Sequence, residues 1–547
     1  MVHMSIAYLS AEVGFESGLH TYSGGLGVLA GDHIKSAADA GIDLIGCTLL
    51  YREGYGRQHL DNHGNQTETF SEIDPHEYLT DTGIEISLPL DGTILHSKIW
   101  VYKIKNIPTY FLDTRHPSNS SNHASLGNRL YGGDDETRIR QEYLLGVGGI
   151  RALQAMGHDI LGLHLNEGHC TFAMFEMLHQ GWTREHLSNC CLFTTHTPVP
   201  AGHDRFEWNS VKEVLGKLLP EDATNLCNSA GDPENGRRCS MSHLAVALSG
   251  PVNAVSNLNA WVASSMFGEQ HISPITNGVH HTTWTSPPMA ELFDEHLSGW
   301  RNKPTSLGHA GSIPTGGLLA AREECRTVLR ELVLATTGVQ LEQGRLTIGF
   351  ARRFATYKRA NLIFRDIERL REIGSGKIQF VFAGKAHPRD EGGKQLIRDI
   401  FSGATEVEND IPIAFLEDYS MNTGLAMTSG VDIWLNNPIR PLEASGTSGM
   451  KAAMNGVPNC SILDGWWPEG CEHGVNGWAI GKGEDDRDDL RDVEYIYHTL
   501  EHEVLPIWRQ GPNRWADLMR ASITTSARFT GARMIDEYRR FYEAFEK

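Results

Sequence analysis

The sequence lacks the features that mark secreted and membrane proteins. Its nine cysteines are odd in number and include no CxxC pair, and Cys190 and Cys191 are adjacent, so no disulfide framework is indicated. No apolar run approaches the roughly 20 residues of a membrane span. Residues 1–15 lack a charged segment followed by an apolar one, so no signal peptide is expected. These absences indicate a reduced, cytoplasmic protein.

Basic residues are also scarce, because 48 lysines and arginines face 68 aspartates and glutamates for a formal net charge of −20. This balance argues against nucleic acid or an anionic membrane as a partner. A neutral polymer is compatible with it, and so is a phosphate substrate if cations cluster locally. The hydrophobic content of 40% and the 57 glycines suit an α/β protein with tight turns, and 547 residues allow two or three domains.

The segment 443–451 reads EASGTSGMK and lies between an apolar run at 431–435 and a predicted helix start at 452–454. The backbone N–H groups of residues 446–449 would remain free at the mouth of that helix, where the helix dipole favours an anion. Lys451 beside such a site can act as a point charge on phosphate, or it can form a Schiff base as in pyridoxal phosphate (PLP) enzymes. Spacing alone does not choose between these, and a glycine-rich turn with a solvated lysine is a further interpretation.

Alternating strand and helix patterns occur in two sets. Such alternation predicts parallel sheets with helices on both faces, and two sets suggest two Rossmann-like lobes that face a deep cleft. We expect lobes at 1–270 and 271–525. The expected strands of the first set are 5–10, 42–50, 160–165 and 192–195, and those of the second are 346–350, 378–383, 411–416 and 431–435. The Gly-, Pro- and Ser-rich segment 301–317 is expected to be a surface loop, and a helix is expected from about residue 357.

Polar residues follow several of the expected strands. Asn166 to His169 and His196 to Pro198 each come directly after one, and ligands of open α/β sheets bind outside the carboxyl ends of strands. Gly24 to Gly27 follows the first strand and precedes a helix, which suits a phosphate site but also suits a plain tight turn. The histidines here lack the spacing of metal ligands, so no metal is predicted.

Residues 352–359 read RRFATYKR and place four cations within eight positions of an acidic chain. They follow the strand expected at 346–350. A solvated basic face is one interpretation. The other is a multidentate anion site, because arginine forks and lysine together hold phosphate.

Beyond these patterns, the chain resembles a known family over most of its length. The segments similar to the PLP segment of the α-glucan phosphorylases are EASGT at 443–447, Met450-Lys451, Asn455-Gly456 and Leu463-Asp464-Gly465. Larger members carry Gly-Asn where this chain has Ser448-Gly449, and arginine where it has Ser420. The resemblance implies a GT-B glycosyltransferase-like fold in which a C-terminal helix, at 526–547, packs back on the first lobe.

The resemblance also implies roles for matching residues. Lys451 would hold PLP, whose phosphate does the acid–base work, and Arg353 and Lys358 would hold the substrate phosphate. The other residues implied at the cofactor are Arg352, Tyr419, Trp284, Thr447, Ser448 and Gly449. Those implied on the sugar side are His196, Glu443, Asn277, Glu167, Gly25, Leu26, Ser445 and Gly446.

The implied activity is retaining phosphorolysis of the non-reducing end of an α-1,4-glucan to α-glucose 1-phosphate. A glycoside hydrolase uses a pair of carboxyl groups as acid and base, and no such pair is evident in this sequence. The resemblance implies that the substrate phosphate, aided by the PLP phosphate, supplies the acid instead. The alternatives are a glucosyltransferase of the glycogen or starch synthase kind and a non-catalytic glucan-binding protein. The phosphorylation and nucleotide switch of the larger animal enzymes is expected to be absent, and a homodimer is compatible with the sequence.

Overall fold

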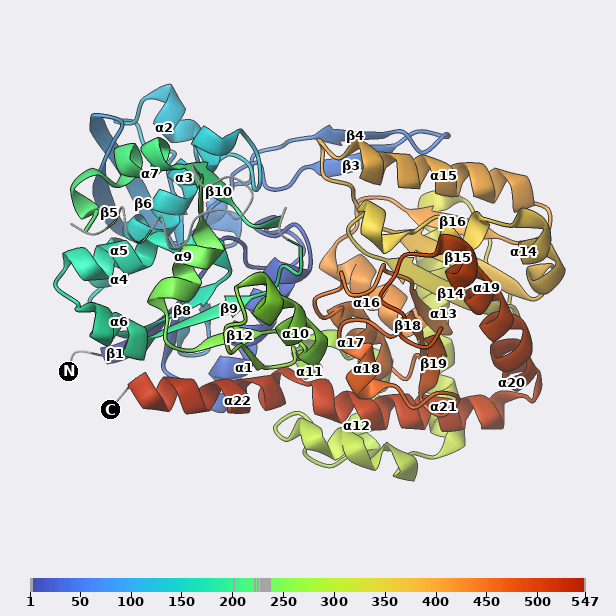
Figure 1. Ribbon diagram of the computed structural model, residues 1–547. Helices are drawn as coiled ribbons and strands as arrows, with labels where there is room; N and C mark the ends of the chain where they lie inside the picture. Colours follow the sequence, from blue (N-terminus) through green and yellow to red (C-terminus); the bar gives the residue numbers. More distant parts are fainter. Residues whose placement is uncertain (1–2, 200–201, 221–222, 224–225, 227–237, 546–547) are drawn as a thin grey trace. The chain divides into compact units, whose positions relative to one another are not determined.

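The computed structural model describes residues 3–199, 202–220, 223, 226 and 238–545 (Figure 1). Contacts divide the chain into two compact units. Unit 1 comprises residues 1–56, 70–276 and 534–547, and unit 2 comprises 57–69 and 277–533. The expected lobes, 1–270 and 271–525, place residues 57–69 in the first lobe, whereas the contacts assign this segment to unit 2. Within the described residues, no helix combines the length and apolar character needed to cross a bilayer.

Unit 1 is built on a nine-stranded sheet with the order β13-β12-β9-β8-β1-β2-β7-β6-β5. The strands from β13 to β7 run parallel, and β6 and β5 add an antiparallel edge that the strand–helix alternation does not predict. The strands are β1 His3–Ser10, β2 Leu44–Leu49, β5 Thr80–Leu90, β6 Thr93–Ile104, β7 Ile107–Asp113, β8 His158–Asn166, β9 Cys191–Thr195, β12 Val252–Ala254 and β13 Ser273–Pro274.

Helices of unit 1 bury apolar side chains against this sheet, and a small ribbon of β10 Arg205–Glu207 and β11 Arg238–Ser240 lies outside it. Residues 135–155 form one helical run, in which a π-helical stretch, Leu144–Gly148, joins two α-helices. The helices are α1 Gly25–Ala40, α2 Ser121–Ser125, α3 Asp135–Tyr143, α4 Gly149–Ala155, α5 Phe172–His179, α6 Arg184–Cys190, α7 Trp208–Leu215, α9 Met241–Leu248, α10 Asn257–Met266 and α22 Gly531–Phe545.

Unit 2 contains a six-stranded sheet in which every described strand pair is parallel, as predicted. The order β16-β15-β14-β17-β18-β19 reverses between β14 and β17. Ligands of such sheets bind at this reversal, outside the carboxyl ends of the two strands. The strands are β14 Leu346–Ala351, β15 Ile378–Ala383, β16 Ile413–Leu416, β17 Ile433–Asn436, β18 Asn459–Ile462 and β19 Gly477–Ile480.

The helices of unit 2 pack around its sheet, and its core includes residues of α13, α16 and α17. The long helix α13 ends at Thr337, because the following Gly338 has a positive φ that terminates it. The helices are α11 His281–Trp284, α12 Pro287–His296, α13 Thr315–Thr337, α14 Ile367–Gly374, α15 Glu391–Val407, α16 Met421–Gly430, α17 Thr447–Met454, α18 Trp467–Gly470, α19 Asp489–Thr499, α20 Leu505–Arg509 and α21 Pro512–Ser526.

Two local predictions in unit 2 are wrong. The segment expected to be a loop at 301–317 forms 3₁₀ turns over Pro304–Ser312, because Pro304, Leu307 and Ala310 recur at every third position and are buried. The helix expected from about 357 is replaced by short 3₁₀ turns, and α14 begins only at Ile367. Arg359 has a φ of +52°, which interrupts a helix there.

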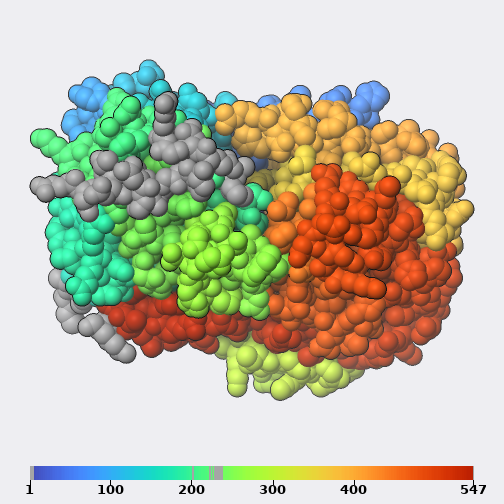
Figure 2. All heavy atoms as spheres, viewed as in Figure 1, coloured from blue at the N-terminus to red at the C-terminus, as the bar shows by residue number. Residues whose placement is uncertain are grey.

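The hairpin of β3 Arg57–Leu60 and β4 Gln66–Thr69 belongs to unit 2, although unit 1 precedes and follows it. The Gln58 amide donates to the Gly384 carbonyl (2.9 Å), and Gln66 donates to and accepts from the backbone of Ala386 (2.9 and 3.0 Å). Figure 2 shows this hairpin, in blue, beside α15, in orange. Both glutamines are buried, so their amides replace water with backbone partners.

The C-terminal helix α22 completes the core of unit 1 through a buried polar network. The Tyr542 hydroxyl lies 2.9 Å from Nε2 of His33 and 2.7 Å from Nδ1 of His164, whose Nε2 lies 2.8 Å from the Thr194 hydroxyl. Burial, with a smaller effect of His196, lowers the pKa of His33 to about 3. The imidazole is therefore neutral at physiological pH, and the network holds α22 without a buried charge.

Replacing Tyr542 by Phe should test this network. The substitution leaves the buried nitrogens of His33 and His164 without their partner, which should cost about 1–3 kcal/mol. We expect a lower midpoint of urea unfolding for Tyr542→Phe. The control is Tyr495→Phe, which removes a half-buried hydroxyl 3.4 Å from Glu484 and should change stability by less than about 0.5 kcal/mol. Equal midpoints for the two variants would contradict the role of the network.

Candidate functional sites

The site in unit 2 forms where its strand order reverses. Arg352 and Lys358 follow β14, Glu443 follows β17, and all three side chains meet. Nη2 of Arg352 lies 2.9 Å from Oε2 of Glu443, and Nζ of Lys358 contacts the same oxygen. The structure thus joins residues 85 to 91 positions apart into one charged cluster with two cations and one carboxylate.

Charge at this cluster follows from burial and ion pairing. Burial alone would raise the pKa of Glu443, but Arg352 and Lys358 outweigh it and lower the pKa below its usual value. Asp464 shows the opposite result, since burial and the neighbouring charge of Glu443 raise its pKa to about 7. Near neutral pH, Glu443 is therefore the ionised carboxyl, and Asp464 is poised to hold a proton.

Helix α17 begins at Thr447, earlier than the expected start at 452, so Lys451 lies in its second turn. Gly446 precedes the helix with a φ of +79°, a conformation that glycine adopts freely. The first backbone N–H groups of a helix have no partner within it, so those of Thr447 and Ser448 lie at its mouth. The Trp434 indole donates to the Ser448 hydroxyl at 3.2 Å.

Three buried donors at this site have no hydrogen-bond partner in the described part of the chain. Nε and Nη1 of Arg352 and the hydroxyl of Ser445 are buried without a hydrogen bond among the described residues. Arg352 as a whole is only 9% exposed, so water cannot freely satisfy its guanidinium. Unsatisfied buried donors of a cation are costly unless a ligand completes them, and an anion supplies the matching acceptors.

Lys451 is buried against an aromatic ring. Its Nζ lies 3.5 Å from the centre of the Trp284 ring, and the residue is 6% exposed. Asn455 fixes both partners, because its amide donates to the carbonyls of Trp284 (2.7 Å) and Lys451 (2.9 Å) and accepts from the backbone of Ser286 (2.8 Å). The hydrogen bonds of Asn455 therefore fix the backbone of Lys451 relative to that of Trp284, so that the amine stays over the indole ring.

The remaining predicted residues of unit 2 lie in neighbouring loops. Asn277 is buried, its carbonyl accepts from Arg533 at 2.9 Å, and its side-chain Oδ1 has no hydrogen-bond partner in the described part of the chain. Tyr419 lies in the loop after β16 and directly follows Asp418, which has a φ of +54°. Arg353 is exposed beside the buried Arg352.

The site in unit 1 lies at the carboxyl ends of β8 and β9. Oε2 of Glu167 accepts from the backbone of His196 (2.8 Å) and from both the backbone and the hydroxyl of Thr197 (3.1 Å each). Glu167 has a φ of +78° and a ψ of 166°, a region almost confined to glycine. Although burial raises the pKa of Glu167, the imidazoles of His203 and His196 lower it below its usual value. The carboxylate therefore holds the turn that carries His196.

Hydrogen bonds determine which nitrogen of His196 carries the proton. The Ser10 hydroxyl donates to the Glu12 carbonyl (2.7 Å), so it accepts from the Asn166 amide (3.0 Å). The Asn166 amide oxygen therefore lies 2.7 Å from Nε2 of His196. Because this oxygen can only accept a hydrogen bond, Nε2 of His196 must carry the proton. Burial lowers the pKa of His196 to about 4. At neutral pH, its Nδ1 is therefore an acceptor.

The first turn of α1 contains Gly25 and Leu26 and is supported by a carboxylate that the sequence-based site did not include. Glu12 accepts from the backbone of Ser23 (2.6 Å) and from the Tyr131 hydroxyl (2.8 Å). A Cβ at Gly27 would lie 2.7 Å from Glu12, so the turn approaches this carboxylate too closely for a side chain. Asp464 was missed in the same way, because an isolated acidic residue gives no periodic signal.

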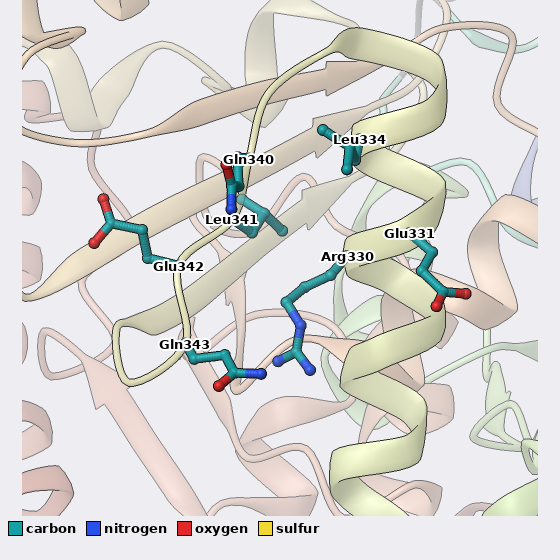
Figure 3. A pocket seen from close by; sticks show the side chains of 7 residues that line it. All are labelled: Arg330, Glu331, Leu334, Gln340, Leu341, Glu342 and Gln343. Atoms are coloured by element: carbon teal, nitrogen blue, oxygen red, sulfur yellow. The ribbon is translucent and has the colours of Figure 1, made fainter.

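No metal cluster is found among these residues, and a surface cavity of unit 2 does not include them. Among the described residues, no group of three or more His, Cys, Asp or Glu side chains is arranged to hold a metal ion. A cavity of about 460 Å³ lies at the end of α13 (Figure 3). It contains none of the predicted site residues. Its lining residues are Arg330, Glu331, Leu334, Gln340, Leu341, Glu342 and Gln343.

Comparison with known proteins supplies the family. The carbohydrate phosphorylase model matches residues 209–469. The maltodextrin phosphorylase of Thermococcus litoralis is 39% identical over 97% of this chain and 70% of its own length. The glycogen phosphorylases of Mycobacterium tuberculosis (36% identical) and Aquifex aeolicus (35%) match 98% and 99% of this chain and 70% and 86% of their own lengths.

Two α/β units with polar residues at the carboxyl ends of their parallel strands, together with the family match, define the class as a GT-B-like glycosyltransferase, as the family resemblance implies. Within that class, the extent and identity of these matches show that the chain belongs to the carbohydrate phosphorylase family.

The raised pKa of Asp464 predicts a pH-dependent stability. Its folded pKa of about 7 exceeds the value of about 3.9 in an unfolded chain, so folding takes up a proton. The stabilisation is complete below about pH 4 and is lost as the pH rises through 7. Asp464→Asn cannot ionise. We therefore expect wild type to lose thermal stability relative to this variant between pH 4 and pH 7 in calorimetry. If the difference in thermal stability between wild type and Asp464→Asn stayed constant between pH 4 and pH 7, the raised pKa of Asp464 would be contradicted.

Proposed function

We propose that this protein is an α-glucan phosphorylase that requires PLP and forms α-glucose 1-phosphate from glucan and orthophosphate with retention of configuration. The observation that carries this proposal is the cluster of Arg352, Lys358 and Glu443 beside the mouth of α17, with Lys451 in the same helix. The family of the chain and the names of its relatives support the reaction and the glucan substrate.

The residues of unit 2 fit PLP. Its aldehyde suits the ε-amine of Lys451, held over the Trp284 ring, and its phosphate suits the unpartnered donors of Arg352 and the N–H groups at the start of α17. The other residues proposed to line it are Tyr419, Thr447, Ser448 and Gly449. When bound, the cofactor supplies a second phosphate group that supports proton transfer from the substrate phosphate.

Holding the substrate phosphate is assigned to Arg353 and Lys358. Two phosphate groups in proximity repel each other, and cations between them reduce that repulsion. Lys358 is 7% exposed and pairs with Glu443, so its charge is directed into the site rather than toward solvent. Arg353 is exposed and offers a guanidinium fork that can follow a diffusible anion.

Three acceptors are assigned to the sugar ring. Glu443 is ionised and can accept from sugar hydroxyls, with the backbone of Ser445 and Gly446 supporting it. Nδ1 of His196 is an acceptor in the tautomer described above, and the unpartnered Oδ1 of Asn277 is a third. Glu167, predicted to contact substrate, is better explained as the group that holds the His196 turn. The turn at Gly25 and Leu26 would approach the sugar phosphate.

These assignments give a complete sequence of proton and bond changes. The substrate phosphate gives a proton to the glycosidic oxygen, the glucan departs, and the phosphate attacks the anomeric carbon from the same face. Neutral and anionic acceptors around the ring stabilise the positive charge that develops on the sugar. The role of Arg352, Arg353 and Lys358 is to hold the phosphate groups together in a site from which water is excluded.

PLP dependence is tested by absorbance and mass. The purified protein should absorb in the near ultraviolet, and borohydride reduction should leave the cofactor mass on the peptide containing Lys451. Lys451→Ala should lose both signals and its glucan-dependent formation of glucose 1-phosphate. Phosphorolysis by a colourless, cofactor-free sample would contradict the proposal. A glucosyltransferase of the synthase kind would lack the absorbance and require a nucleotide sugar.

Removing the phosphate-binding lysine should separate chemistry from cofactor binding. Lys358→Ala should lower kcat for phosphorolysis by at least about 10³-fold, equivalent to about 4 kcal/mol, while near-ultraviolet absorbance is retained. The control is Lys303→Ala, at an exposed lysine of the same unit, which should leave kcat within about twofold. An unchanged kcat for Lys358→Ala would remove this residue from the mechanism.

A further inference from the structure

We propose that Asp464 is a positioning residue that holds the Glu443 loop in its active geometry by binding the backbone of Glu443. This inference rests on the proposed function, in which Glu443 accepts hydroxyl groups of the sugar. Asp464 itself is assigned no contact with substrate or cofactor. It acts through Glu443, from the loop that follows β18.

The first support is the use of both carboxylate oxygens. Oδ2 of Asp464 accepts from the backbone N–H of Glu443 at 2.9 Å, and Oδ1 accepts from the backbone N–H of Gly465 at 2.8 Å. Asp464 is only 3% exposed. A buried carboxyl with two such hydrogen bonds has little conformational freedom. It therefore links the loop after β18 to the loop after β17 at Glu443, whose side chain is assigned to the sugar.

The second support is an independent backbone contact between the same loops. The backbone N–H of Trp466 donates to the carbonyl of Ser445 at 2.8 Å. Gly465 has a φ of +58°, and a Cβ at this position would lie 2.4 Å from the Ser445 carbonyl oxygen. The segment 464–466 therefore packs so closely against 443–445 that only glycine fits at position 465, between the hydrogen bonds made by Asp464 and Trp466.

The third support is the charge of the surrounding groups. The carboxyl of Asp464 faces the carboxylate of Glu443 and the ammonium of Lys358, and Arg440 binds the neighbouring carbonyl of Leu463 while pairing with Asp485. Burial and Glu443 raise the pKa of Asp464 to about 7. A proton on Asp464 leaves Glu443 as the single negative group facing the cations, so the anions that bind there meet less repulsion.

A double-mutant cycle tests whether Asp464 acts through Glu443. Asp464→Asn keeps the size of the side chain but turns an NH₂ group toward one of the two backbone donors. We expect kcat for phosphorolysis to fall about 10- to 100-fold, because small displacements of a catalytic group have effects of this size. The KM for orthophosphate should change less than about twofold. In a Glu443→Gln background, adding Asp464→Asn should lower kcat by less than about twofold further.

Control variants separate this role from general destabilisation. Asp432→Asn changes another buried carboxyl of unit 2, which accepts from the backbone of Thr347 (2.8 Å) at the opposite end of β17. It should leave kcat within about twofold. If Asp464→Asn does not fold, Gly465→Ala strains the same contact and should show the same dependence on Glu443.

The outcomes distinguish the inference from the proposed function. Full additivity of Asp464→Asn and Glu443→Gln, or an unchanged kcat for Asp464→Asn, would overturn the positioning role while leaving the function intact. If Glu443→Gln alone had no effect on phosphorolysis, the assignment of Glu443 in the proposed function would fail instead. A loss in kcat that is absent from the Glu443→Gln background would support the positioning role.

Discussion

The ion pairs of Arg352 and Lys358 with Glu443 are the interaction on which the unit 2 site depends. Each residue is largely buried, and isolated buried charges are unstable, so the three side chains must remain together or meet a ligand. The reversal of strand order between β14 and β17 brings them together. The sheet topology thus gathers these side chains at one edge, and the cations give it a local positive charge that the acidic chain as a whole lacks.

Much of this arrangement could be predicted from local patterns. The alternation of strands and helices predicted the parallel sheet of unit 2, and the glycine-rich segment before Lys451 predicted the helix mouth. The roles of Asp464 and Glu12 could not, since they depend on loops that are distant in sequence. The docking of Gln58 on Gly384 bridges 326 positions, for which neither composition nor periodicity gives a signal. The early start of α17 follows from the φ of Gly446, which a sequence does not display.

The two sites use different physical means. In unit 2, full charges oppose one another at short distance, and their balance can change with the protonation of Asp464. In unit 1, a strained glutamate and a buried amide orient His196, whose imidazole stays neutral. An anionic ligand is suited to the first environment and an uncharged hydroxylated ligand to the second, which agrees with the proposed reaction between phosphate and a glucan.

The assignment of 57–69 to unit 2 and of 534–547 to unit 1 means that the chain passes between the units four times. During synthesis, the core of unit 1 lacks Tyr538 and Tyr542 until the residues of unit 2 have been made. The hairpin, in contrast, is made long before the strands it docks on. Neither half can therefore mature by itself as it emerges, and a cut between residues 276 and 277 would yield two incomplete fragments rather than two domains.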